Sequence, residues 1–229
     1  MVLQVSLNKR EIRDVEAVRD MDAAVLRKMA SAIVRLDPPP LKLDSLLEVV
    51  RNAEGASIEL TDAVIRLTLS LYRRVRQAGC DVAEVMGGVH AAIQRDLNWS
   101  GELLTRWRNA ESCIQELLNA PAIRLVSLSI DLSYAHANLL RSSRILTDIR
   151  PVYNAEATAI EAAVVSHTLR LRYDSLDGLH EISIAIDECD VRNLAKQCER
   201  ATVKSRTARQ LMSDKAEVPT IISGGTDGA

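Results

Sequence analysis

The sequence predicts an α+β protein, in which an all-helical N-terminal region precedes a small antiparallel β-sheet closed by one C-terminal amphipathic helix. Two observations predict this fold class. Between Lys9 and Ala120 the apolar residues recur every three or four positions, the spacing of helices that bury one face. After Pro121 the spacing changes to two, the period of a strand with one buried face. We therefore expect a helical domain at residues 1–121, a sheet-and-helix domain at 122–214 and a disordered tail at 215–229.

The helical half divides at residues that favour helix ends. Residues 9–36 fit either one long helix or two helices joined near Asp20. Three successive prolines at 38–40 must end this segment, because proline lacks a backbone donor and disfavours helical geometry in the residue before it. Further helices are expected at residues 44–53, 57–78, 81–97 and 100–119. The first of these should end at Glu54 and Gly55, and the second at Gly79.

The sheet is expected to begin soon after Pro121. From Val126 to Tyr134, apolar residues alternate strictly with Ser and Asp, as in a strand with one exposed face. A second, less regular strand is expected at residues 144–153. Between them, residues 135–143 could form a helical turn, a loop or a bulged continuation of the strand.

The clearest strand pattern covers residues 163–173 and leads into a β-hairpin that ends at residue 186. Asp177 and Gly178, in the expected turn, tolerate the positive φ that such turns require. Asp187 can then cap a helix whose first turn is acidic. The apolar seam of this helix should pack on the sheet, where each large side chain contributes roughly 1.5 to 3 kcal/mol. The seam consists of Val191, Leu194, Cys198, Ala201, Ser205, Ala208 and Met212.

Composition and charge exclude several classes of protein. The 229 residues carry 29 Lys and Arg against 31 Asp and Glu, so no overall basic field favours non-specific nucleic-acid binding. Aromatic residues make up 3% of the chain, too few for a ladder of base-stacking platforms. No apolar stretch reaches membrane-spanning length, and the four cysteines lack paired spacing. We therefore expect a cytoplasmic protein with no membrane insertion and with reduced, mostly buried thiols.

The segment from Val164 to Ala201, VVSHTLRLRYDSLDGLHEISIAIDECDVRNLAKQCERA, resembles the C-terminal module of the COMM-domain family. The shared pattern is a long alternating strand, a polar turn, a shorter strand ending in acidic residues and an amphipathic helix. The preceding NWSGELLTRWRNAESCIQELL is similar to the family's linker region. The family's Trp in the first strand and its Pro at the start of the next are missing here. The resemblance implies a module that dimerises by embracing a second copy, with dimers assembling into rings or hetero-complexes, and it implies no catalytic residues.

The expected sheet points to a partner on physical grounds as well. A sheet of three or four strands covered by one helix keeps a second face, and in residues 163–173 that face is either the apolar or the polar set. Unless the N-terminal helices fold over it, a partner must cover it. We therefore expect a non-catalytic oligomerising scaffold or adaptor that pairs with itself or with related COMM-like chains and can build larger assemblies. The expected interface consists of Val165, His167, Leu169, Leu171, Tyr173, Ile182, Ile184, Ile186, Leu194 and Cys198.

The main alternative is a nucleic-acid-associated regulator that uses the basic face of the last helix. The same face is the expected contact for an acidic partner. It carries Arg192, Lys196, Arg200, Lys204 and Arg206. A weaker alternative is an enzyme with a pocket between the two halves around Asp148, Arg150 and His167. Because the sequence has no metal-binding His pattern and no Gly-rich phosphate loop, we expect no catalytic or metal-ligating residues, no cofactor and no small-molecule ligand.

Overall fold

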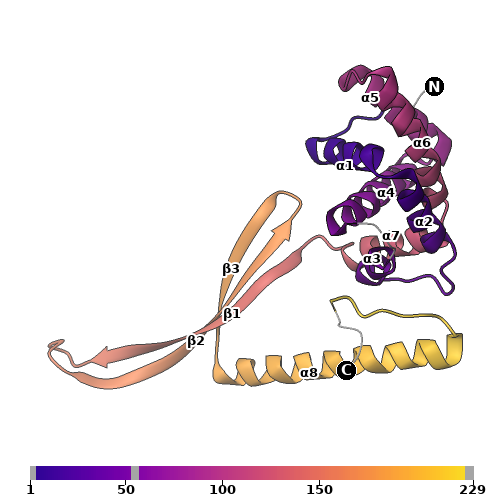
Figure 1. Cartoon of the computed structure of the whole chain (residues 1–229). Helices are drawn as coiled ribbons and strands as arrows, with labels where there is room; N and C mark the ends of the chain where they lie inside the picture. The colour runs from indigo at the N-terminus through magenta and orange to yellow at the C-terminus, as the bar shows by residue number, and fades with distance from the viewer. Residues whose placement is uncertain (1–3, 53–56, 225–229) are drawn as a thin grey trace. The chain divides into compact units, whose positions relative to one another are not determined.

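The computed structural model of the protein describes residues 4–52 and 57–224 and has the predicted α+β fold (Figure 1). Within those residues it contains eight helices and one three-stranded antiparallel sheet. The chain divides into two units, Met1–Ser133 and Tyr134–Ala229.

The first unit is a bundle of helices. Seven helices lie in its described residues: α1 (Lys9–Asp20), α2 (Ala23–Val34), α3 (Leu43–Arg51), α4 (Ile58–Ala78), α5 (Val82–Asp96), α6 (Gly101–Leu118) and α7 (Pro121–Ser133). Their facing sides form one core of aliphatic residues around Trp107, which is fully buried. The chain has no Phe. Most of the large core side chains are therefore Leu, Ile, Val and Met.

Most helix boundaries in this unit follow the predicted signals. Residues 9–36 form two helices, and the Asp22 carboxylate caps the second by accepting from the Ala24 and Val25 amides. Asp81 caps α5, with the Glu84 side chain closing a capping box. Helix α4 ends at Gly79, whose φ of +62° favours glycine. Helix α3 ends at Arg51, and the predicted stop at Glu54 and Gly55 lies outside the described residues.

The predicted first strand, residues 126–134, is wrong. Residues up to Ser133 belong to helix α7, which lies against α2, α3, α4 and α6. Its buried residues, Ala122, Ile123, Val126 and Ser127, follow helical spacing. An interval of four fits both periods, so Val126 and Ile130 share a face in a strand and also in a helix. The sequence pattern therefore fits both a strand and a helix. The segment is a helix because its apolar residues pack against the other helices of the bundle. The division between the units accordingly falls after Ser133, not at the expected residue 121.

The second unit contains the sheet. Its strands are β1 (Leu139–Tyr153), β2 (Ile160–Ser175) and β3 (Gly178–Ile186), in the order β1-β2-β3 with antiparallel neighbours. This confirms the strand predicted at 144–153 and the hairpin predicted at 163–186. Gly178, with φ of +130°, stands at the β2–β3 turn, as expected. Residues 139–143 continue β1 through a register shift, which agrees with the bulged continuation considered for that segment.

Strands β1 and β2 extend well beyond the end of β3. The last β3 residue, Ile186, pairs with His167, whereas the β1–β2 ladder continues to the pair Tyr153 and Ile160. The far part of the sheet, residues 148–153 and 160–166, is therefore a two-stranded ribbon, visible in Figure 1 as the extension of β1 and β2. We call this part the ribbon.

Helix α8 (Glu188–Ala216) follows β3 directly and begins at the predicted cap, with Asp187 and Asp190 forming a capping box. The expectation that its seam is buried against the sheet is wrong, because no described residue of α8 is buried. Leu194 and Met212 remain 39% and 40% exposed. The helix also includes residues 215 and 216, so the tail expected from residue 215 begins after the helix, and residues 225–229 lie outside the described part.

Candidate protein-interaction surfaces

The strand register sorts the side chains of the sheet onto two faces. Ile145, Leu169 and Ile184 form one row across β1, β2 and β3. Directly paired residues share a face, and alternate residues along each strand follow them. The surface that results, here called the apolar face, carries Ile145, Ile149, Val165, Leu169, Leu171, Tyr173, Ile182, Ile184 and Ile186, together with His167 and His180.

The opposite surface, here called the polar face, is suited to water over the three-stranded part. The Glu181 carboxylate lies 3.3 Å from Arg170 Nε and 3.7 Å from Arg172 Nε. Ion pairs at such exposed positions contribute little to stability, typically about 0 to 1 kcal/mol. Their main consequence is that this side of the sheet does not need a cover.

The apolar face has no cover within the second unit. Ile149 and Val165 are 72% and 59% exposed, and Ile182 and Ile184 are 45% and 42% exposed. No residue among 134–224, the described part of this unit, is buried. Contiguous apolar surfaces of this kind are typical of sites where proteins, membranes or ligands bind.

Eight of the ten predicted interface residues lie together on the apolar face. The other two, Leu194 and Cys198, lie on one side of α8 and are exposed, and the structure does not bring them onto the sheet. Ile145 and Ile149 also belong to the face but were not predicted. The alternation at 144–153 identified their strand, but only its register with β2 reveals that they align with Leu169 and Val165.

The two histidines of the apolar face stand near opposite ends of its three-stranded part. His167 pairs with Ile186, and its Nδ1 lies 3.0 Å from Thr147 Oγ1. The ring of His180 stacks on Tyr173 at 5.5 Å between centroids, and its Nε2 lies 2.9 Å from Asp177 Oδ1. The hydrogen bond from Ser175 contributes most to lowering the pKa of Asp177, and the hydrogen bond from His180 contributes next. Each imidazole thus has a polar neighbour at the border of the apolar surface.

The three residues of the predicted enzyme pocket do not converge. Asp148 and Arg150 lie on the polar side of the sheet, whereas His167 lies on the apolar face. The sheet itself separates the carboxylate and the guanidinium from the imidazole. These three side chains therefore cannot surround one ligand.

The basic face of α8 is open to solvent. Arg192, Lys196, Arg200, Lys204 and Arg206 are all exposed, and Arg192 Nη1 lies 3.2 Å from Glu188 Oε1. Of the four free cysteines, Cys113 is buried, Cys80 is half-buried, and Cys189 and Cys198 are exposed, so the prediction of mostly buried thiols is wrong for α8. In the part of the chain that the structure describes, no three His, Cys, Asp or Glu side chains are placed to hold a metal ion.

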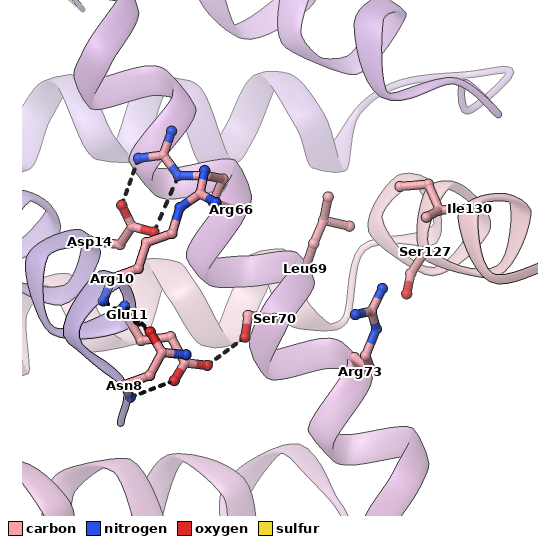
Figure 2. Close-up of a pocket in the computed structure, with 10 residues that line it drawn as sticks. All are labelled: Asn8, Arg10, Glu11, Asp14, Arg66, Leu69, Ser70, Arg73, Ser127 and Ile130. Atoms are coloured by element: carbon pink, nitrogen blue, oxygen red, sulfur yellow. Dashed lines mark hydrogen bonds and ion pairs between the residues drawn. The ribbon is translucent and has the colours of Figure 1, made fainter. Parts of the chain in front are cut away.

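A separate cavity of about 290 Å³ lies in the first unit (Figure 2). Helix α4 and the first turns of α1 form most of its wall, and α7 supplies Ser127 and Ile130. The lining residues are Asn8, Arg10, Glu11, Asp14, Arg66, Leu69, Ser70, Arg73, Ser127 and Ile130. Sequence reasoning missed this site, because its residues come from helices that are distant in the chain.

Ion pairs join α1 to α4 along this cavity. Asp14 Oδ1 lies 2.6 Å from Arg66 Nη2, and Glu11 Oε1 lies 2.7 Å from Arg74 Nη2. Glu11 also accepts hydrogen bonds from the Ser70 hydroxyl and the Asn8 amide. Burial opposes ionisation of Glu11, but these hydrogen bonds and the Arg74 charge outweigh burial and lower its pKa.

Comparison with known proteins adds no assignment for either surface. The sequence matches no protein-family model and no curated protein. The resemblance to the COMM-domain family therefore stays a prediction from the residues. Among the described helices, none combines the length and the apolar character needed to cross a membrane.

Proposed function

We propose that the protein is a non-catalytic scaffold or adaptor whose second unit associates with a second copy of the chain through the apolar face. One observation carries the proposal. The described part of the second unit holds three strands and a helix of 29 residues but not one buried side chain. Ordering a residue costs roughly 1 to 2 kcal/mol of backbone entropy, and only burial of apolar surface can offset a cost of that size.

A second copy fits because each chain supplies both halves of a complementary pair. Each has an uncovered apolar sheet face and an unpartnered helix whose seam runs from Val191 through Cys198 and Ser205 to Met212. With 29 residues, α8 is about 43 Å long, enough to cross all three strands. The small residues in the seam allow close approach to a sheet. Two chains related by a two-fold axis would cover each other's sheet in the same way.

The exposed side chains of the apolar face would contribute several kcal/mol to such a contact. Ile145, Ile149, Val165, Ile182 and Ile184 each keep about half of their surface exposed or more, so covering each would contribute roughly 1 kcal/mol. The half-buried Leu169, Leu171 and Tyr173 lie among them and would add to the same contact. The free energy gained by covering these apolar side chains exceeds the free energy that the exposed ion pairs of the polar face could provide.

A pair of substitutions on adjacent β3 residues tests this proposal. Ile184→Glu places a charge on the apolar face, whereas Ser183→Glu places the same charge on the polar face, opposite Arg170. Light scattering on the full chain should give about twice the chain mass of 25.2 kDa for the wild type and for Ser183→Glu. Ile184→Glu should lower the mass toward one chain or leave the second unit unfolded by circular dichroism.

Two results would contradict the proposal. One is a folded wild-type monomer at micromolar concentration. The other is an Ile184→Glu variant that keeps the mass and stability of Ser183→Glu, since a covered face could not accept an unpaired carboxylate without cost. If the protein instead pairs with a related COMM-like chain, the wild-type protein would be stable only when that chain is present.

The nucleic-acid alternative rests on the solvent-exposed basic face of α8. If it applied, duplex DNA or RNA would bind with an affinity that falls steeply with salt concentration. The triple variant Lys196→Glu, Arg200→Glu and Lys204→Glu would then lose that binding while keeping the mass of the wild type. We expect no salt-sensitive binding, because the chain as a whole has a net charge of −2.

A further inference from the structure

We propose that the cavity between α1, α4 and α7 binds an acidic peptide segment in which Glu or Asp is next to an aliphatic residue. The site lies in the first unit and does not depend on the association proposed for the second. Three features of the cavity carry the inference: a surplus of guanidinium groups, a hydroxyl that faces the cavity without a protein partner, and an apolar wall beside it.

The surplus of positive charge follows from how the ion pairs are distributed. The two carboxylates that line the cavity are already neutralised, Asp14 by Arg66 and Glu11 by Arg74. The Arg10 side chain has no partner among the described residues. Arg73 reaches Asp131 at 3.3 Å, but Arg76 pairs with the same carboxylate. Arg10 and Arg73 are therefore available to an anion, and a guanidinium binds a carboxylate well.

The unpartnered hydroxyl belongs to Ser127. This residue is only 4% exposed, and its side chain makes no hydrogen bond within the described part of the chain. Figure 2 shows the Ser127 hydroxyl turned toward the side of the cavity where the Arg73 guanidinium lies. A ligand oxygen in the cavity would accept a hydrogen bond from this hydroxyl.

The apolar wall and the size of the cavity define the rest of the ligand. Leu69 and Ile130 lie beside the polar groups and would contact an aliphatic side chain. A volume of about 290 Å³ is at the low end for ligand pockets and holds one or two side chains. Arg10 and Arg73 are exposed at its edge, so the positive surface continues outside the cavity. A peptide that runs past the edge fits this arrangement better than a free molecule confined to the cavity.

Binding can be measured by NMR on the full chain with labelled Ile methyl groups. The probe is the blocked tripeptide Glu-Leu-Glu, with Gln-Leu-Gln as the uncharged control. We expect Glu-Leu-Glu to shift the Ile130 methyl signal in a saturable manner and the control peptide to leave it in place. Arg10→Ala and Ser127→Ala should each weaken binding roughly tenfold, as expected for loss of a hydrogen bond to a charged group.

Arg13→Ala is the matched control, since Arg13 is also an exposed arginine of α1 but does not line the cavity. It should bind the tripeptide as the wild type does. Arg10 is exposed and unpaired, so its replacement keeps the packing intact and the test does not depend on Ser127→Ala alone. The proposal is overturned if neither peptide shifts Ile130, if both shift it equally, or if Arg13→Ala weakens binding as much as Arg10→Ala. Equal binding of free 4-methylpentanoate would likewise overturn it in favour of a small acid.

Discussion

Three arginines of α4, at positions 73, 74 and 76, each form an ion pair with a carboxylate of another helix. In the sequence they form a basic cluster typical of a solvated helix face. In the folded unit Arg74 lies beside Glu11 of α1, while Arg73 and Arg76 share Asp131 of α7. The cluster therefore connects α4 to the helices on either side. No periodicity could have predicted this, because the acidic partners are more than fifty residues away in the chain.

Glu11 should make the first unit sensitive to acid. Its pKa is lowered in the folded state, so its contribution to stability is complete above the unfolded-state value of about 4.3 and is lost as pH falls through the folded pKa. Glu11→Gln should cost about 2 kcal/mol at neutral pH and reduce the loss of stability at acidic pH. Urea unfolding of the full chain between pH 7 and pH 3, followed through the fluorescence of Trp99 and Trp107, measures both effects.

Glu111 is the control, because its pKa is shifted in the opposite direction to the pKa of Glu11. Desolvation raises its pKa, although the nearby His90 and Arg108 act against that shift. A raised carboxyl pKa means that stability is greatest below the unfolded-state value and decreases as pH rises through the folded one. Glu111→Gln should therefore leave stability unchanged or increase it at neutral pH. A loss equal to that of Glu11→Gln would show that removal of any carboxylate away from solvent, and not loss of the Glu11 hydrogen bonds, causes the effect.

At the level of elements, local signals predicted most of the secondary structure. Capping residues such as Asp81 and Ser100, the glycine after α4 and the alternation in β2 each depend on near neighbours, so the sequence displays them directly. Helix α7 depends on the surfaces that the neighbouring helices provide, and the seam of α8 predicts a helix but not the surface on which it packs. The apolar-face residues on β2 and β3 could be predicted because the sequence displays the turn at Asp177 and Gly178, whereas the residues on β1 could not, because the sequence shows no comparable signal for the turn between β1 and β2.

Helix α7 can be tested at Ser129, a half-buried position inside the segment that the sequence assigned to a strand. Valine is unfavourable relative to alanine in a helix and favourable in a strand. Ser129→Ala should therefore be more stable than Ser129→Val by about 0.5 kcal/mol in thermal unfolding. The reverse order, or extended-type Cα chemical shifts over residues 126–133, would contradict the helix.

At the scale of the whole molecule, the two units obtain their stability in different ways. The first has its own aliphatic core, while the described part of the second has none. If a second copy provides the missing cover, folding of the second unit follows mass action. The unfolding temperature of that unit should rise with protein concentration, and that of the first should not.

Differential scanning calorimetry over a hundredfold range of concentration would separate these behaviours. Ser183→Glu should keep the concentration dependence and Ile184→Glu should abolish it. A second unit that unfolds at the same temperature at every concentration would mean that it is stable within a single chain. That result would contradict the proposed association without affecting the cavity in the first unit.

The ribbon beyond β3 has a consequence for how chains could exchange partners. Ile149 and Val165 lie on one of its sides and continue the apolar face, whereas Val152 and Val164 share the other side with Asp148 and Arg150. A partner that covers the apolar face would therefore extend its contact along one side of the ribbon, past the end of β3. The longer contact would slow the dissociation of two subunits, so mixed particles would form only slowly when two finished homodimers are mixed in a tube.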